Sequence, residues 1–187
     1  MPPSPMFSAV RVGGAGEPRP HFLMTDRLGF RCWSKADLPL ANALWGDPEV
    51  TSMIGGPFTP EQIEDRLNKE IASMIASRVQ YWPVFLLRTG EHAGCAGLRP
   101  YRIETQFYEL GIHLRPPFWG RGLAQEAGRA LITFAFKTLG ANALFAGHHP
   151  RNAPSRRVIE KLGFHFTREE FFPPTGVKHP FYLLTKG

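Results

Sequence analysis

The sequence predicts a single α/β domain built on a mixed β-sheet, and three observations carry this prediction. Strand-like and helix-like segments follow one another in the order strand, helices, three strands, helix, strand, helix and two strands. Residues 107–114 alternate apolar and polar side chains, as a strand with one buried face does. The apolar run of residues 143–149 lacks alternation, which is typical of a strand buried on both faces. A helical pattern between these two strands makes them a parallel pair.

The first half of the chain begins with a stretch rich in Pro, Gly and Ser. We expect residues 1–20 to be a flexible tail and residues 21–187 to form the domain. Strand and helix signals then alternate, and Thr59 followed by Pro60 marks a helix start. The expected strands cover residues 28–33, 81–88 and 93–101, and the expected helices cover residues 38–45 and 60–77.

The second half contains the crossover and two closing strands. In the strand 107–114, Glu109, Gly111 and His113 face away from the apolar side chains. After it we expect a helix over residues 122–139 with Gly140 as its C-cap, the strand 143–149, a helix from Ala153 to Gly163, and strands over residues 164–172 and 179–186. The count is about seven strands and about four helices.

Composition limits the classes of function. The chain of 187 residues carries a net charge of +6, which favours acidic or phosphate-bearing partners. The basic residues are scattered, and the densest cluster, at residues 151–161, is either a solvated helix face or a nucleic-acid contact. No helix-turn-helix spacing precedes that cluster, so nucleic acid ranks last among the partners. No apolar run approaches the roughly 18–20 residues of a membrane span.

The two cysteines, Cys32 and Cys95, could pair, but their number and spacing do not suggest a disulfide framework. The start of the chain lacks the apolar stretch of a secretory signal, so we expect a cytoplasmic protein. Cys95 lies on a strand of small residues and is interpreted as a core residue. The adjacent pair His148 and His149 would point to opposite faces of a strand, so no metal site is expected.

A glycine loop, Trp119-Gly-Arg-Gly-Leu-Ala124, leads from a strand into a helix. The first N–H groups of a helix lack internal partners and its N-terminus carries a partial positive charge, so this loop can hold a phosphate. A Walker loop would need a Lys that is absent, and a dinucleotide fingerprint would need Gly where Gln125 stands. A glycine turn that only connects strand and helix is the remaining alternative.

The segment "YELGIHLRPPFWGRGLAQEA" followed by "NAPSRRVIEKLGF" resembles the GNAT superfamily of acetyl-coenzyme A-dependent N-acetyltransferases. The chain is most similar to the branch that includes the ribosomal-protein N-terminal acetyltransferases, and the resemblance covers about residues 25–186. It implies a GNAT fold whose mostly antiparallel sheet has a central, splayed parallel pair, at residues 107–114 and 143–149.

The resemblance also implies a set of residues that bind the coenzyme. The pyrophosphate would be held by the backbone N–H groups of Trp119, Gly120, Arg121, Gly122, Leu123, Ala124 and Gln125. The pantetheine arm would pair with the backbone of Ile112, His113 and Leu114, and Asn152 would contact the coenzyme. Trp119 replaces the Gln or Arg of the wider family, as is usual in this branch.

Acetyl transfer requires an amine without its proton and a proton for the leaving thiolate. Glu109 is the first candidate for the general base, with a salt-bridging or amine-binding Glu as the alternative, and His113 is the second candidate. Ser155 matches a position from which a serine can approach the thiol, or it is a helix-capping serine.

The acceptor is expected to be a primary amine, either a protein N-terminal α-amine or a small molecule. Arg99, Tyr101 and Trp82 are candidates for lining its site, with core packing as the alternative for the two aromatic residues. A non-catalytic acyl-CoA-binding module on the same fold is the alternative function, and a homodimer is one expected assembly.

Overall fold

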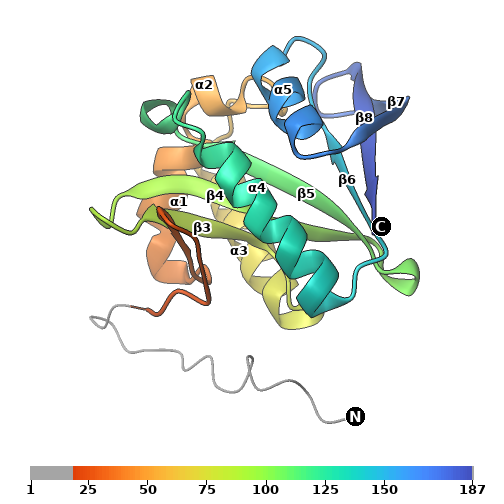
Figure 1. Ribbon diagram of the computed structural model, residues 1–187. Helices are drawn as coiled ribbons and strands as arrows, with labels where there is room; N and C mark the ends of the chain where they lie inside the picture. Colours follow the sequence, from red (N-terminus) through yellow and green to blue (C-terminus); the bar gives the residue numbers. More distant parts are fainter. Residues whose placement is uncertain (1–18, 187) are drawn as a thin grey trace.

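An eight-stranded mixed sheet with the order β1-β2-β3-β4-β5-β6-β8-β7 runs through the computed structural model, which describes residues 19–186 (Figure 1). All neighbouring strands are antiparallel except β5 and β6, which confirms the predicted parallel pair. The strands are β1 (Leu23–Met24), β2 (Leu28–Phe30), β3 (Tyr81–Leu86), β4 (His92–Arg102), β5 (Phe107–Leu114), β6 (Ala143–Gly147), β7 (His165–Phe172) and β8 (Val177–Thr185).

Five α-helices accompany the sheet. They are α1 (Leu38–Trp45), α2 (Pro48–Thr51), α3 (Pro60–Ser77), α4 (Leu123–Phe134) and α5 (Ala153–Lys161). Thr59 caps α3 with a reciprocal capping box to Gln62, as the Thr-Pro signal predicts. Gly140 has a φ of 70° and ends the α4 region, which confirms its role as a C-cap.

The differences from the expected elements are local. β1 and α2 are two and four residues long, too short to leave a periodic signal, so the strand and helix counts exceed the expected seven and four by one each. The helix expected over residues 122–139 is α4 followed by a π-helical turn, Ala135–Leu139. β6 ends at Gly147, so His148 and His149 lie beyond the strand.

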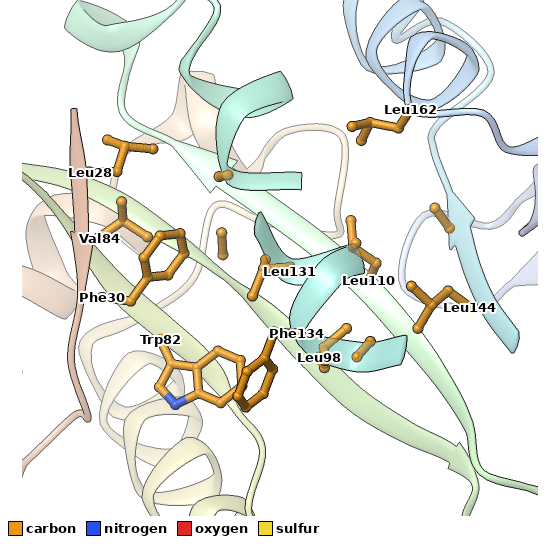
Figure 2. Packing of buried hydrophobic residues seen from close by; sticks show 14 of the residues in the cluster. Leu28, Phe30, Trp82, Val84, Leu98, Leu110, Leu131, Phe134, Leu144 and Leu162 are labelled. Atoms are coloured by element: carbon orange, nitrogen blue, oxygen red, sulfur yellow. The ribbon is translucent and has the colours of Figure 1, made fainter. Parts of the chain in front are cut away.

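Helices cover both faces of the sheet, with α4 on one face and α1 and α3 on the other (Figure 1). On the α4 face, Leu131 and Phe134 of the helix pack over Trp82, Leu98 and Leu110 of the strands (Figure 2). The ring centroids of Trp82 and Phe134 are 5.7 Å apart, and Trp82 is fully buried. Trp82 is therefore a core residue and does not line the acceptor side.

The second face has a smaller core, formed by Trp33, Ala41, Leu44, Trp45, Ile63, Leu67, Tyr81 and Cys95. Strand alternation divides β5 between the two faces, with Tyr108, Leu110 and Leu114 in the α4 core. Glu109, Gly111 and His113 consequently face α3, as the alternation predicts. Each fully buried Leu or Trp of these cores stabilises the fold by roughly 1.5–3 kcal/mol.

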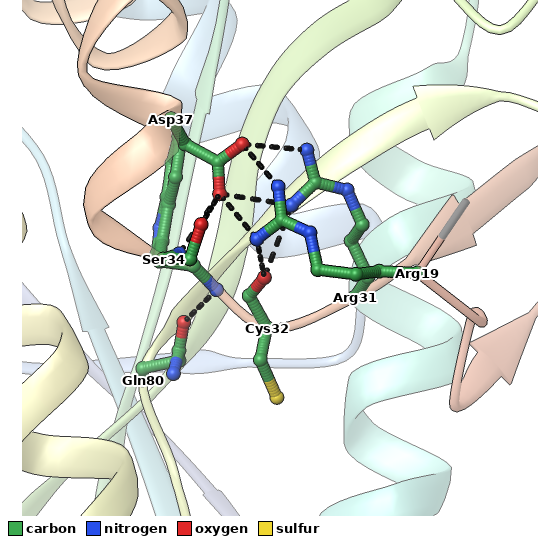
Figure 3. A network of polar contacts seen from close by, with 7 residues as sticks. Arg19, Arg31, Cys32, Ser34, Asp37 and Gln80 are labelled. Atoms are coloured by element: carbon green, nitrogen blue, oxygen red, sulfur yellow. Dashed lines mark hydrogen bonds and ion pairs between the residues drawn. The ribbon is translucent and has the colours of Figure 1, made fainter. Parts of the chain in front are cut away.

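Asp37 connects the start of the described chain to the second face (Figure 3). Its carboxylate accepts hydrogen bonds from Arg19 at 2.7 Å, from Arg31 at 2.9 Å and from the backbone N–H of Ser34 at 2.8 Å. The expected tail lies outside the described residues up to residue 18, whereas Arg19 belongs to this network.

Candidate active site

The parallel pairing of β5 and β6 ends early. Its last pair is Glu109 and Phe145, and β5 continues over residues 110–114 with β4 as its sheet partner. The two strands separate beyond that pair, and α5 follows β6 on the separated side (Figure 1). Glu109 therefore lies at the point where the two strands part, here called the apex, and Ile112, His113 and Leu114 lie on the part of β5 that no longer pairs with β6.

The loop that follows β5 is shaped by two glycines at the mouth of α4. Gly120 and Gly122 have φ values of 69° and 75°, which side-chain-bearing residues rarely adopt. A Cβ atom on Gly120 would meet nothing within 4 Å, and one on Gly122 would meet only a nitrogen of Arg27 at 3.6 Å. Gly122 is the N-cap of α4 and supplies no side-chain cap. No capping side chain therefore occupies the mouth of α4, and the N–H groups of its first turn lack intrahelical partners, as an anion site requires.

Trp119 and Arg27 hold this loop in place. The indole N–H of Trp119 donates to the carbonyl oxygen of Leu114 at 2.6 Å, which fixes the loop to the end of β5. Arg27 donates to the carbonyl oxygen of Arg121 at 2.9 Å and pairs with Glu126 at 2.6 Å. Because that pair neutralises the only carboxylate in the first turn of α4, the loop keeps its attraction for a phosphate.

Two side chains lie beside Glu109 on the α3 face, those of Arg99 and Tyr81. Arg99 lies directly opposite it on β4. The ring of Tyr81 lies under Arg99, whose guanidinium carbon is 4.1 Å from the ring centroid. A Cβ on Gly111 would come within 2.1 Å of the Tyr81 hydroxyl, so that hydroxyl lies against the backbone two residues beyond Glu109. Burial, and then the charge of Glu109, raises the pKa of Tyr81, which is therefore protonated at neutral pH.

His113, which is half-buried, and the fully buried Cys95 lie together on the same face. The sulfur of Cys95 is 3.8 Å from Nδ1 of His113. Burial, followed by the charges of Arg66 and Arg99, lowers the pKa of His113 well below its usual range, so the imidazole is neutral. Burial, followed by the charge of Glu70, raises the pKa of Cys95 to about 12. Cys95 is therefore a protonated core thiol, as expected, and is no nucleophile.

The start of α5 corrects one interpretation of Ser155. Asn152 is the N-cap, and its Oδ1 accepts the backbone N–H of Ser155 at 3.1 Å. The expectation that Ser155 is a helix-capping serine is therefore wrong, because Ser155 is the third residue of the helix and its backbone is capped by Asn152. The proposed approach of its hydroxyl to a thiol stays a prediction.

The two histidines after β6 have structural partners. Nδ1 of His148 lies 2.8 Å from the carbonyl oxygen of His149, and Nε2 lies 3.4 Å from the Tyr182 hydroxyl. His149 accepts the backbone N–H of Arg151 at 3.2 Å. Within residues 19–186, no group of three or more His, Cys, Asp or Glu side chains could hold a metal ion.

Two hollows are open on the surface. One, of about 520 Å³, lies between α3 and β4, and its wall includes Arg66, Glu70, Arg99 and Pro100. The other, of about 800 Å³, lies between the β1–β2 segment and the outer side of α4. The larger one reaches Gly122. The smaller hollow, here called the α3 cleft, includes Arg99, which lies opposite Glu109.

Residues 27–165 match the family model described as acetyltransferase (GNAT) domain. The chain belongs to this acetyltransferase family. It is an acetyl-CoA-dependent N-acetyltransferase with a GNAT fold, as its motifs indicate. Among the residues that the structure describes, no helix is long and apolar enough to cross a membrane.

Relatives of similar length share this assignment. The acetyltransferase is 37% identical over 151 residues to the uncharacterized N-acetyltransferase YnaD of Bacillus subtilis (strain 168), covering 80% of this chain and 85% of the relative. It is 30% identical over 144 residues to the uncharacterized N-acetyltransferase p20 of Bacillus licheniformis, covering 76% of this chain and 81% of the relative. A solved structure of RimL, a ribosomal L7/L12 alpha-N-protein acetyltransferase in complex with coenzyme A, has a TM-score of 0.75 and 15% identity over 86% of this chain and 95% of that one, which shows a shared fold.

In this GNAT enzyme, the α3 cleft adds residues that the sequence alone did not bring to the site. Glu70 is 1% exposed, yet it continues the apolar stripe of Ile63 and Leu67 at the spacing i, i+4, i+7. A carboxylate on such a stripe indicates a buried, partnered group, so this signal was present. Tyr81 and Arg66 left no comparable signal, since an aromatic residue in a buried strand and a basic residue on a helix are both ordinary.

Proposed function

We propose that this acetyltransferase moves the acetyl group of acetyl-CoA directly to a primary amine, either a protein N-terminal α-amine or a small-molecule amine. The observation that carries the proposal is the opening in the sheet: pairing ends at Glu109, and the free side of β5 leads to an open, cap-free helix start. An extended arm fits along β5, and a pyrophosphate fits the glycine loop.

The coenzyme would supply the thioester, and residues of this chain would bind the rest of it. The N–H groups of residues 119–125 would hold the pyrophosphate, Ile112, His113 and Leu114 would pair with the pantetheine, and Asn152 would add a contact. This arrangement directs the thioester toward the apex and leaves the α3 face of the sheet for the acceptor.

Glu109 is then the group best placed to take the proton of the acceptor amine. The amine nitrogen forms a bond to the acetyl carbon, the carbon–sulfur bond breaks, and the proton of the amine passes to Glu109, directly or through a water molecule. The departing thiolate takes a proton, for which Ser155 is the candidate donor. No residue of the enzyme becomes acetylated, in agreement with the protonated state of Cys95.

Replacement of Glu109 by Gln tests this role. We expect Glu109→Gln to lower turnover by about a hundredfold, because general-base catalysis contributes at least that factor, while the Kd for acetyl-CoA stays the same. Release of the coenzyme thiol with a panel of amines measures turnover, and Glu104→Gln, an exposed Glu on the β4–β5 connection, is the matched control. Unchanged turnover would remove Glu109 from the mechanism. Coenzyme binding without transfer to any amine would instead favour a non-catalytic acyl-CoA-binding module.

A further inference from the structure

Arg66 is a cation without an anionic partner in the wall of the α3 cleft. Its guanidinium carbon lies 4.8 Å from the ring centroid of Trp45 and 5.6 Å from that of Phe58. Its Nε is buried without a hydrogen bond, and no carboxylate within residues 19–186 forms an ion pair with it. Arg66 is half-buried, and a partly desolvated guanidinium without a counterion destabilises the protein, so a ligand that enters the cleft is a natural source of that counterion.

The acidic residues near Arg66 do not fill this role. The carboxylate of Glu70 is committed to Arg99 and to the backbone N–H of Tyr81, which it accepts at 2.7 Å. Asp65 neighbours Arg66 along α3, and adjacent helical residues do not face each other. The cleft wall holds three cations, including Lys69, and two carboxylates, so one positive charge is left over.

The cleft also leads to the catalytic apex. Arg99 belongs to the cleft wall and lies directly opposite Glu109 across β4 and β5. Residues opposite each other in an antiparallel pair have Cβ atoms about 5 Å apart. A small molecule held at Arg66 can thus extend past Arg99 to present a second group to Glu109.

We propose that the acceptor is an amine that also carries a carboxylate, such as an amino acid, and that Arg66 is the residue that recognises this carboxylate. This inference rests on the proposed function and adds the substrate class. The planar guanidinium, which lies near two aromatic rings, can donate two parallel hydrogen bonds to a carboxylate. Polyamines and aminoglycosides are excluded as good acceptors, because they would bring further positive charge to a cleft whose wall already holds one more cation than carboxylates.

The test compares acceptors that differ only at the carboxylate. For each of the twenty amino acids, kcat/KM is measured for the free acid and for its carboxamide, with spermidine and kanamycin as polycationic acceptors. We expect at least one free acid to exceed its carboxamide tenfold or more. The amine of a carboxamide is the less basic of the two, so such a preference cannot come from the supply of unprotonated amine.

Arg66→Met retains an apolar stem for the contacts with Trp45 and Phe58 and removes the charge. In this variant the ratio of acid to carboxamide should fall at least tenfold, mainly through the KM for the acid, whereas the exposed Arg88→Met should keep the wild-type ratio. Arg66→Lys should give an intermediate ratio, and it replaces Arg66→Met if the latter fails to fold. An unchanged ratio in these variants would overturn the inference.

A binding measurement separates this inference from the proposed function. By titration calorimetry in the presence of coenzyme A, the N-acetyl derivative of an amino acid should bind at least tenfold more tightly than its carboxamide, whether or not turnover is seen. Equal binding, or acetylation of carboxamides and polyamines as efficiently as of acids, overturns only the carboxylate specificity. Absence of transfer to every amine, together with selective binding of N-acetyl acids, overturns only the transfer reaction.

Discussion

At the scale of single residues, the Asp37 carboxylate accepts hydrogen bonds from Arg19, from Arg31 and from the backbone of Ser34 on the second face. Burial alone would raise its pKa, but the hydrogen bonds from Arg31 and Arg19 outweigh burial and hold the pKa well below its usual range. A carboxyl whose folded-state pKa is depressed contributes stability above its unfolded pKa of about 3.9, and this contribution is lost as the pH falls below that value.

We therefore expect Asp37→Asn to reduce the free energy of unfolding at pH 7 by about 3 kcal/mol, because two arginines lose their buried partner. The same substitution should reduce the loss of stability between pH 5 and pH 3. Urea unfolding at pH 7, pH 5 and pH 3 measures both effects. A variant as stable as the parent protein at pH 7 would show that the network is not needed for folding.

His92 is a second residue whose contribution to stability depends on pH, and here the cause is burial without hydrogen-bond partners. It is 5% exposed, both ring nitrogens lack partners, and burial, followed by the charge of Arg115, lowers its pKa to about 4. A histidine with a depressed pKa contributes stability that is present above its unfolded pKa of about 6.5 and is lost as the pH falls toward 4.

His92→Phe should remove that part of the acid sensitivity. His92 already packs against Trp33 and Phe85, with ring centroids 5.8 and 5.3 Å away, so a phenyl ring has suitable neighbours. We expect the variant to be about 1 kcal/mol more stable at pH 5, since an unsatisfied buried polar group costs that much or more. Thermal unfolding at pH 7 and pH 5 gives the comparison, and the same pH dependence in both proteins would contradict this account.

At the scale of elements, two glycines at the ends of α4 allow the effect of a substitution on coenzyme binding to be separated from its effect on backbone strain. Gly122 and Gly140 have φ values of 75° and 70° and lie before and after the same helical segment. A side chain at either position carries a similar strain of about 1 kcal/mol. A substitution of Gly140 is therefore a matched control for the same substitution of Gly122.

Gly122→Glu should weaken acetyl-CoA binding at least a hundredfold, because it places a carboxylate where the pyrophosphate is proposed to bind. Gly140→Glu should leave the affinity near that of the parent protein, and both variants should lose similar stability. Titration calorimetry and thermal unfolding measure the two quantities. Micromolar binding by Gly122→Glu would refute the assignment of the loop.

The elements also show how far the sequence leads. The alternation of residues 107–114 predicted both the strand and the faces of Glu109 and His113, because a period of two leaves no other arrangement. The position of the parallel partner followed from the crossover. The end of the pairing at Glu109, and the meeting of Arg66 with Trp45 and Phe58, depend on how helices and strands pack across the sheet. No local pattern encodes such contacts.

At the scale of the whole molecule, the proposed coenzyme joins elements that are far apart in the chain. The loop before α4, the free side of β5 and the start of α5 would all contact one ligand. A ligand that binds only the folded state at 100 times its Kd adds about 2.7 kcal/mol of stability. Saturation with coenzyme A should thus raise the Tm by several degrees, as differential scanning fluorimetry would record. No shift in the parent protein would contradict the proposed coenzyme site.

Within the described part of the chain, the outer side of residues 110–114 of β5 has no neighbouring strand. In most proteins such an edge is a template on which another extended chain can add, and aggregation begins there. In the proposed mechanism this edge stays open for the coenzyme, whose pantetheine arm would cover it. Cofactor supply would then govern the solubility of this acetyltransferase as well as its activity, and the loaded form would be the one suited to concentration and storage.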